Sequence, residues 1–180
     1  MLASPRPDPG DASITPSSPV RTLRPLPELD YHHSQTVDLP VAITPLEAWN
    51  LMTSGQGPVM RAAFRIRDAI SARFGVKRIG GFSGAPRDSV QTGDRLDFFL
   101  VEDSAPERLV LTERDRHLDV MICLTVVARR LTVTASVVTH NAYGRIYMLP
   151  VGIAHKVIVA RYIRHLRRAV QERAPRPGVA

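Results

Sequence analysis

The sequence predicts an α+β fold in which a curved antiparallel sheet wraps around a long C-terminal helix. Strand patterns with short connections fill residues 95–141, and short connections force neighbouring strands to run antiparallel. An amphipathic helical pattern then runs from about residue 148 to residue 172. An antiparallel sheet needs a cover for its apolar face, and this helix is the element long enough to provide it.

The first 30 residues differ in composition from the rest of the chain. They hold seven of the fifteen prolines, and proline fits neither a helix interior nor a central strand. We therefore predict a disordered Pro-rich extension over residues 1–30, one folded domain over residues 31–172 and a disordered tail over residues 173–180. A domain of this size can bury most of its apolar surface.

One strand and two helices come first in the domain. HHSQTVDLP alternates polar and apolar residues, which predicts a strand over residues 32–40. TPLEAWNLM opens with the capping box of Thr44 and Glu47 and with Pro45 at the first helical position, so a short helix begins there. Apolar residues at helical spacing over residues 58–74 predict a second helix.

A glycine-rich loop and four strands follow. The loop, IGGFSGAPRDSVQTGD, lacks the ending of a phosphate-binding loop and the spacing of a nucleophile elbow, so we interpret it as a mobile connection or a lid. Turn signals separate the strands RLDFFLVED, ERLVLTERD, HLDVMICLTVVA and RLTVTASVVTHN. On the final helix, the predicted apolar stripe consists of Val151, Ala154, Val157, Ile158, Tyr162, His165, Leu166 and Ala169. The gap between such a helix and its sheet is commonly a ligand cavity.

The net charge of +7 originates near the C-terminus. Residues 145–176 contain eight lysines and arginines against Glu172 alone. These cations complement the dipole of the final helix, or else they bind nucleic acid or an anionic membrane surface. Because no aromatic residue is interleaved with the last arginines to stack on bases, we do not expect a nucleic-acid partner. An interaction module that uses Arg164, Arg167 and Arg168 is nevertheless one function class that the sequence allows.

Other classes are disfavoured by composition. Arg129 and Arg130 interrupt the longest apolar run, so we expect no membrane span. No apolar stretch follows Met1 and Leu2, which argues against a secretory signal. The single cysteine, Cys123, excludes an internal disulfide and fits a reducing compartment. We expect a cytoplasmic protein without a metal or cofactor, and the oligomeric state is left open.

Three polar residues form the first candidate site. Asp115, His117 and Asp119 alternate, so in a regular strand their side chains share one face. An imidazole between two carboxylates can act as a general base or contact a ligand, and these residue types also bind metals. The apolar residues of opposite parity over residues 118–126 suit the cavity side. That parity places the three residues on the outer face, where salt bridges to arginines are the structural alternative.

The passage from the last strand into the final helix is the second candidate. Asn141 can cap the helix, and Tyr147 lies at the expected cavity mouth. Arg145 can hold a carboxylate or phosphate of a ligand, or else tie the helix start to Asp68 or Asp119. His155 follows near the apolar stripe, where it is either a structural boundary residue or an acid-base catalyst.

Four segments also resemble a known family. They are FRIRDAI around Arg67 and Asp68, DRHLDV from Asp115 to Val120, TASVVTHNAYGRIYM from Thr134 to Met148, and AHKVIVARYIRH around His155. In this order they resemble the uncharacterised bacterial family "domain of unknown function 2867" of the START-like, polyketide cyclase-like (SRPBCC, helix-grip) superfamily. The resemblance implies a helix-grip fold and brings no reaction. Members often carry Phe where this chain has Val120.

Two functions fit these observations. The first is binding of a small apolar or amphipathic molecule between the sheet and the final helix. The second is an enzyme of the cyclase, dehydratase or hydrolase kind, in which a histidine opens into the cavity beside another polar group and Arg145 orients the substrate. The catalytic candidates are His117, His155 and Asp119; the ligand-binding candidates are Arg67, Asp115, His117, Asp119, Asn141, Arg145, Tyr147 and His155.

Overall fold

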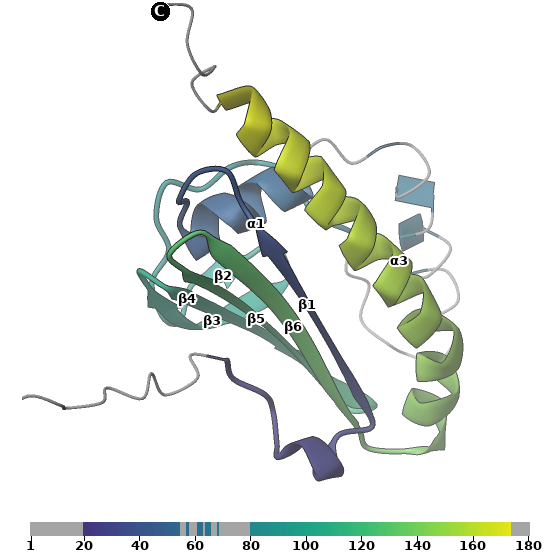
Figure 1. The fold of residues 1–180 in the computed structure, drawn as a ribbon. Coiled ribbons are helices and arrows are strands. Elements are labelled where there is room, and N and C mark those ends of the chain that lie inside the picture. Colours follow the sequence, from purple (N-terminus) through teal and green to yellow (C-terminus); the bar gives the residue numbers. More distant parts are fainter. Residues whose placement is uncertain are drawn as a thin grey trace, which may run out of the picture.

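A six-stranded antiparallel sheet and a long C-terminal helix form the protein (Figure 1). The computed structural model describes residues 20–54, 57, 61–62, 64–65, 68 and 80–173. The strands are β1 (Tyr31–Asp38), β2 (Arg95–Leu96), β3 (Phe99–Ala105), β4 (Arg108–Arg114), β5 (Leu118–Val127) and β6 (Arg130–Thr139). The helices with defined bounds in the described part of the chain are the 3-10 turn η1 (Leu26–Glu28), α1 (Pro45–Thr53) and α3 (Ala142–Arg173). The predicted α+β class, with its antiparallel sheet and terminal helix, is confirmed.

The order of the strands in the sheet is β1-β6-β5-β4-β3-β2. Strands β2 to β6 are joined consecutively, whereas β1 returns to pair with β6 at one edge, with Tyr31 opposite Val137. The predicted strand over residues 95–103 is divided into β2 and β3 because Asp97 adopts a positive φ of 57° between them. The other predicted strands are found within two residues of their expected bounds.

Helix α1 begins as its sequence predicts. The Thr44 side chain accepts a hydrogen bond from the Glu47 backbone N–H (3.1 Å), and Glu47 Oε2 accepts one from Thr44 N–H (2.7 Å). Together these bonds form the capping box, with Pro45 at the first helical position. The helix buries Trp49 and Met52, and it packs against α3, β4 and β5.

Helix α3 begins at Ala142, six residues before the predicted start. Gly144 and Pro150 resemble helix breakers, but both lie inside the helix. A Cβ at Gly144 would lie 2.3 Å from the His117 carbonyl oxygen, so this glycine permits close contact with the turn before β5. Pro150 is exposed on the outer side of the helix, which continues through it.

The predicted apolar stripe of α3 is partly wrong. Val157 is 64% exposed, and Ala154 and His165 are exposed as well. The buried hydrophobic residues of the helix are Val159, Ile163, Leu166 and Val170. Because the first half of α3 is apolar on more than one side, periodicity alone could not decide which side faces the sheet.

The sheet has an inner face toward α3 and an outer face. Val120, Ile122 and Leu124 lie on the inner face, opposite Val137, Ala135 and Val133 of β6. The predicted parity of β5 is therefore confirmed for its apolar row. Strand registers place the side chains between these positions on the outer face.

Residues 20–30 run along the outer face, on the side away from α3 (Figure 1). The backbone N–H of Arg21 donates to Cys123 Sγ (3.3 Å), and that of Leu23 donates to Ser136 Oγ (3.1 Å). The prediction of disorder thus fails for the end of the extension, because its backbone donors find partners on the sheet. Residues 1–19 and 174–180 lie outside the described residues, and so does most of the second helix predicted over residues 58–74.

Candidate functional site

Two adjoining cavities lie between the inner face of the sheet and α3. The larger has a volume of about 300 Å³ and the smaller about 140 Å³. They share Val120, Tyr147, Val151 and His155. The larger cavity is also lined by Trp49, Met52, Thr53, Phe64, Phe82, Phe99, Ile122, Leu124, Val133, Ala154, Ile158, Val159 and Tyr162. The smaller adds Tyr31, Phe98, Glu113, Asp115, Leu118, Ala135, Val137 and Met148.

Aromatic rings form one end of the larger cavity. Phe82, from the glycine-rich loop, has its ring centroid 5.3 Å from Trp49, 5.5 Å from Phe64 and 5.4 Å from Phe98. The ring of Tyr162 on α3 lies 6.3 Å from Phe82. Pairs of this geometry contribute beyond their area burial. The glycine-rich loop thus supplies part of the cavity wall, as the lid interpretation requires.

A hydrogen-bonded pair joins β1 to α3 at the shared wall. The Tyr31 hydroxyl lies 3.1 Å from the Gly152 carbonyl oxygen and 3.3 Å from His155 Nδ1. Because a carbonyl only accepts, the hydroxyl proton goes to Gly152, and His155 Nδ1–H donates to the Tyr31 oxygen. This tautomer leaves Nε2 as an acceptor on a ring that lines both cavities.

His155 is neutral at pH 7. Burial, helped by the neighbouring His33, lowers its pKa from the ordinary 6.5 to about 4. The ring of His33 meets that of His155 edge-on at 5.8 Å, and burial also lowers the pKa of His33, with Lys156 and His32 acting in the same direction. The site therefore presents a neutral imidazole that accepts a hydrogen bond rather than a cation.

Tyr162 is a second polar group at the larger cavity. Its hydroxyl is buried and has no hydrogen-bond partner among the described residues. Burial raises the pKa of Tyr162 to about 12, with Arg161 opposing the shift, so the phenol keeps its proton. A buried donor without a partner costs about 1–3 kcal/mol, and a ligand oxygen in the cavity would satisfy it.

Asp115 organises the turn between β4 and β5. Its Oδ1 accepts from the backbone N–H groups of His117 (2.6 Å) and Leu118 (3.0 Å), and its own N–H donates to the Leu118 carbonyl (3.0 Å). This is a local turn in which a short carboxylate replaces backbone acceptors. Asp115 also lines the smaller cavity, together with Glu113, whose carboxylate pairs with Arg95 (3.2 Å).

His117 lies in that turn and not in a strand, because β5 begins at Leu118. Arg116 Nε donates to His117 Nε2 (2.9 Å), which leaves the proton on Nδ1, 3.2 Å from Asn141 Oδ1. The ring is buried against Tyr143, at a centroid distance of 4.7 Å. Among the described residues, neither cavity has His117 in its wall. A histidine with both ring nitrogens engaged holds the turn against α3.

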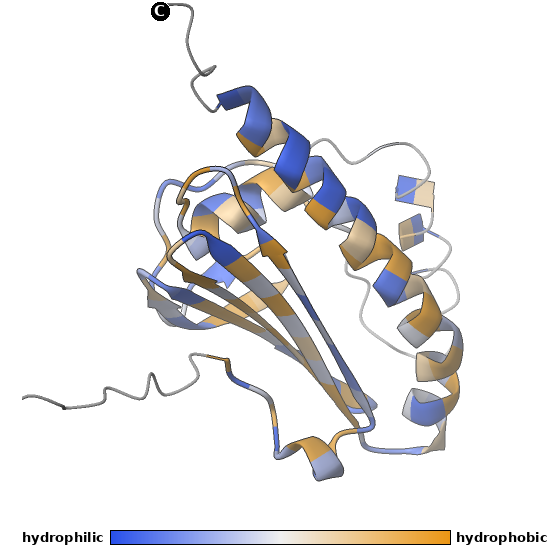
Figure 2. Cartoon of the chain, viewed as in Figure 1, coloured by the Kyte–Doolittle hydropathy of each residue, from blue (hydrophilic) through white to orange (hydrophobic). Residues whose placement is uncertain are grey.

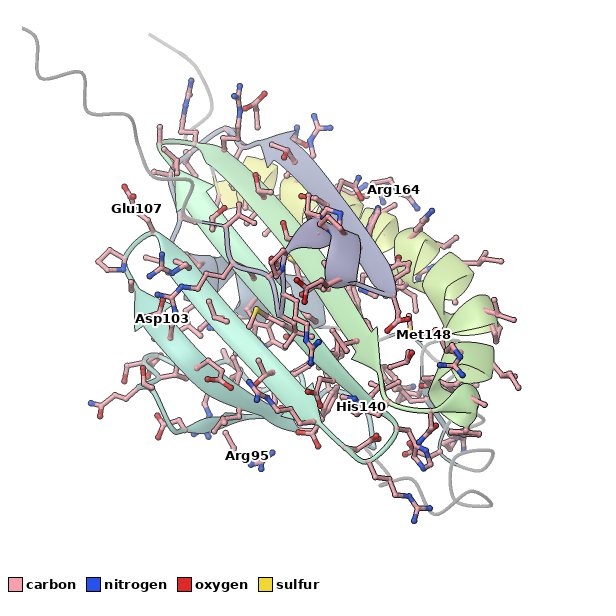
Figure 3. All side chains as sticks on the ribbon, turned by 90° about the horizontal axis from the view of Figure 1, so that it is seen from below. Arg95, Asp103, Glu107, His140, Met148 and Arg164 are labelled. Atoms are coloured by element: carbon pink, nitrogen blue, oxygen red, sulfur yellow. The ribbon has the colours of Figure 1, made fainter. Side chains whose placement is uncertain are left out.

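Asp119 alone of the three polar residues occupies the outer face of β5. Its Oδ1 lies 3.1 Å from Nε2 of His140, which Figure 3 labels near the end of β6. The prediction that Asp115, His117 and Asp119 share one face is therefore wrong. Tight turn geometry over residues 115–118 interrupts the alternation on which that prediction depended.

The start of α3 carries two further candidates. Asn141 caps the helix, because its Oδ1 accepts from the Gly144 backbone N–H (3.0 Å). Arg145 is exposed, lines neither cavity, and makes no ion pair with Asp68 or Asp119 in the described part of the chain. The helix starts earlier than expected and turns this side chain outward, so its position supports neither predicted role of Arg145.

Tyr147 and His155 are the two candidates that line both cavities. Met148, labelled in Figure 3 between α3 and the sheet, lines the smaller one. Arg67 lies outside the described residues. Within the described part of the chain, no three His, Cys, Asp or Glu residues are grouped so that they could hold a metal ion.

Sequence reasoning missed Tyr31 and Tyr162 as site residues. Tyr31 lies inside the predicted domain but just before the first predicted strand, although it has the same strand parity as the inner-facing Val37. Tyr162 belongs to the predicted apolar stripe, and nothing in its spacing indicates an unpartnered hydroxyl. The alternation of side chains along β1 is the feature of the sequence that could have placed Tyr31 on the inner face.

The family model described as "Protein of unknown function (DUF2867)" matches residues 25–162. The chain belongs to this family. The matched range includes every described residue that lines the two cavities, from Tyr31 to Tyr162. No curated protein and no solved structure matches the chain. The expected family is confirmed, while its START-like placement and a bacterial origin stay predictions.

Proposed function

We propose that this protein is a cytoplasmic helix-grip protein of the START-like kind that binds a small apolar or amphipathic molecule between its sheet and α3. The observation that carries the proposal is the pair of adjoining cavities, of about 300 and 140 Å³, with apolar and aromatic walls and a few polar groups. Ligand sites in proteins commonly have this size and composition. The single thiol, Cys123, is compatible with a reducing compartment.

The polar groups of the cavity indicate a neutral ligand with an oxygen atom. His155 offers an acceptor and Tyr162 a donor, and both are uncharged at pH 7. No lysine or arginine is among the described residues of the two cavity walls, whereas Glu113 and Asp115 stand at the smaller cavity. A carboxylate or phosphate ligand would lose hydration there without gaining a counter-ion. An uncharged molecule with a hydroxyl or carbonyl group suits the walls better.

An enzyme that uses His155 is the second candidate function. The observation that favours it is that His155 opens into both cavities beside the Tyr31 hydroxyl, which is the arrangement expected of an acid-base residue. The Tyr31 contact fixes the ring orientation and leaves Nε2 free to take a proton. With a pKa of about 4, the imidazole would be a weak base, suited to labile protons. Arg145 has no part in this version of the mechanism.

Native mass spectrometry of the purified full-length protein, followed by organic extraction, tests the binding function. The Val120→Trp variant fills the point where the cavities meet, and Met121→Trp places the same ring on the outer face of the same strand. We expect a retained neutral molecule in the wild type and in Met121→Trp, and its loss in Val120→Trp. Equal retention in all three proteins, or retention in none together with no binding of an apolar probe, would overturn the proposal.

A His155→Gln variant separates binding from catalysis. Gln keeps a donor toward Tyr31 but cannot exchange a proton near pH 7. The binding function predicts retention of the ligand with no chemical difference between the extracts of the two proteins. If the wild-type extract instead contains a converted form of a molecule that the variant retains unchanged, the enzyme function replaces the binding function.

A further inference from the structure

The outward side of α3 carries an exposed apolar stripe. Ile146, Leu149, Ile153 and Val157 are spaced by three, four and four residues, and each is between 64% and 72% exposed. Helical periodicity puts them on one face, opposite the cavity-lining Val151 and His155 of the same helix. None of the four lines either cavity. Large apolar side chains gathered in this way on a surface mark an interaction site.

The same face of α3 becomes basic in its second half. Arg164 follows Ile146 by 18 residues, or five helical turns, and Arg167 and Arg168 flank it. All three arginines are exposed, and no ion pair joins them to an acidic residue in the described part of the chain. Figure 2 shows the change from hydrophobic to hydrophilic colouring along the helix, and Figure 3 labels Arg164 on it.

Charge complementarity selects the partner. Between Ala142 and Arg173 the helix has seven lysines and arginines, including Arg145 and Lys156 beside the stripe, and Glu172 is its one acidic residue. A second copy of this face would bring like charges together, which disfavours a symmetric dimer through α3. Nucleic acid would pair with the arginines but leave the apolar stripe in water. An anionic bilayer surface can bind both the apolar stripe and the arginines, because its acyl chains and its phosphates lie at adjacent depths.

We propose that α3 docks the folded protein on an anionic membrane surface. The helix lies in the plane of the headgroups, with Leu149, Ile153 and Val157 inserted and Arg164, Arg167 and Arg168 on lipid phosphates. By length and composition α3 could also cross a membrane. Another side of the helix is buried in the hydrophobic core through Val159, Ile163, Leu166 and Val170, and a spanning helix would have to give up these contacts. Docking parallel to the surface keeps that core intact.

Vesicle co-sedimentation of the full-length protein tests the proposal. Neutral phosphatidylcholine vesicles are compared with vesicles that contain 30% phosphatidylglycerol, at about 0.05 M and about 0.3 M NaCl, which brackets the range over which surface charge is screened. We expect binding to the anionic vesicles only, and weaker binding at high salt. The triple change Arg164→Gln, Arg167→Gln and Arg168→Gln should weaken partitioning roughly 100-fold at low salt, at about fivefold per arginine.

The apolar half needs its own variant. Leu149→Gln with Ile153→Gln removes two exposed side chains without touching the core, so the fold is kept, and partitioning should fall by at least about tenfold. Leu26→Gln, at a residue 59% exposed on the other side of the sheet, is the control and should bind like the wild type.

Several outcomes would overturn the proposal. No binding to anionic vesicles does so directly. Unchanged binding of Leu149→Gln with Ile153→Gln would show a purely electrostatic patch in place of an inserted helix. Self-association that the same apolar variant abolishes, seen by analytical ultracentrifugation without vesicles, would identify a second copy as the partner. Retention of nucleic acid that only the arginine variant loses would identify that partner instead.

Discussion

The environment of His155 predicts a specific loss of stability at acidic pH. In the unfolded chain its pKa is near the ordinary value of 6.5, and in the folded protein burial beside Tyr31 and His33 lowers the pKa to about 4. Above pH 6.5 the imidazole is neutral in both states and contributes nothing to the pH dependence. As the pH falls below 6.5, the unfolded state takes up a proton that the folded state refuses. The free energy of unfolding therefore declines between about pH 6.5 and pH 4.

The size of this decline follows from the shift. One pKa unit corresponds to about 1.4 kcal/mol, and between pH 7.5 and pH 4.5 the lowered pKa of His155 costs about 2.5 kcal/mol. His33 acts in the same direction, because its pKa is lowered too. Other ionisable groups of the protein add a background that the variants share. Only the difference between variants isolates His155.

Urea unfolding of the wild type and of His155→Gln, at pH 7.5 and pH 4.5, measures that difference. We expect the wild type to lose about 2.5 kcal/mol more than the variant over this interval. His165→Gln, at an exposed position on α3, should behave like the wild type. Equal losses in the wild type and in His155→Gln would refute the neutral, buried histidine, and with it the argument for an uncharged ligand.

Three further changes test other parts of the structure. Gly144→Ala drives a methyl group to 2.3 Å from the His117 carbonyl oxygen and should lower the free energy of unfolding by about 3 kcal/mol. Gly152→Ala places its methyl group 3.0 Å from the ring edge of Tyr31, which needs a shift of only a few tenths of an ångström, so the loss should stay at about 1 kcal/mol. Chemical denaturation compares the two variants, and similar losses would contradict the close contact at Gly144. Tyr162→Phe removes a hydroxyl without a partner, so stability should stay equal or rise by up to about 1 kcal/mol while oxygen-containing ligands bind more weakly. Calorimetry of the variant with and without ligand checks both effects. A large loss of stability in Tyr162→Phe would show that the Tyr162 hydroxyl has a hydrogen-bond partner in the native protein. Cys123 should react with iodoacetamide at pH 8 at least about 100-fold more slowly in the native than in the unfolded protein, because the thiol is buried and burial raises its pKa. Comparable rates would mean that residues 20–30, which run along the outer face, open readily.

Periodic patterns and caps predicted most of the fold. The alternation of β5 identified the inner row that lines the cavities, and the capping box at Thr44 located the start of α1. These features depend on neighbouring residues along the chain, which a single sequence contains. The pairing of β1 with β6 was not predicted, because it joins segments about a hundred residues apart and leaves no local signal.

The errors arise where long-range contacts override local patterns. Gly144 indicates a turn from its residue type, but in the structure it allows a helix to approach the His117 carbonyl. His117 alternates with Asp119 along the sequence, yet Asp115 closes a turn that removes His117 from the strand. Cavities are a further case, since their volume depends on how several elements pack, and no residue in isolation indicates an empty space.

Titration with N-phenyl-1-naphthylamine, an uncharged apolar fluorophore, tests the central claim most directly. The account predicts saturable binding with one probe per chain, at least tenfold weaker binding to Val120→Trp, and unchanged binding to Met121→Trp. Because the new ring of Val120→Trp fills empty space, that variant should also unfold at a urea concentration close to the wild-type value. Equal binding of the probe to Val120→Trp and Met121→Trp would contradict the claim that the space between the sheet and α3 is a ligand site.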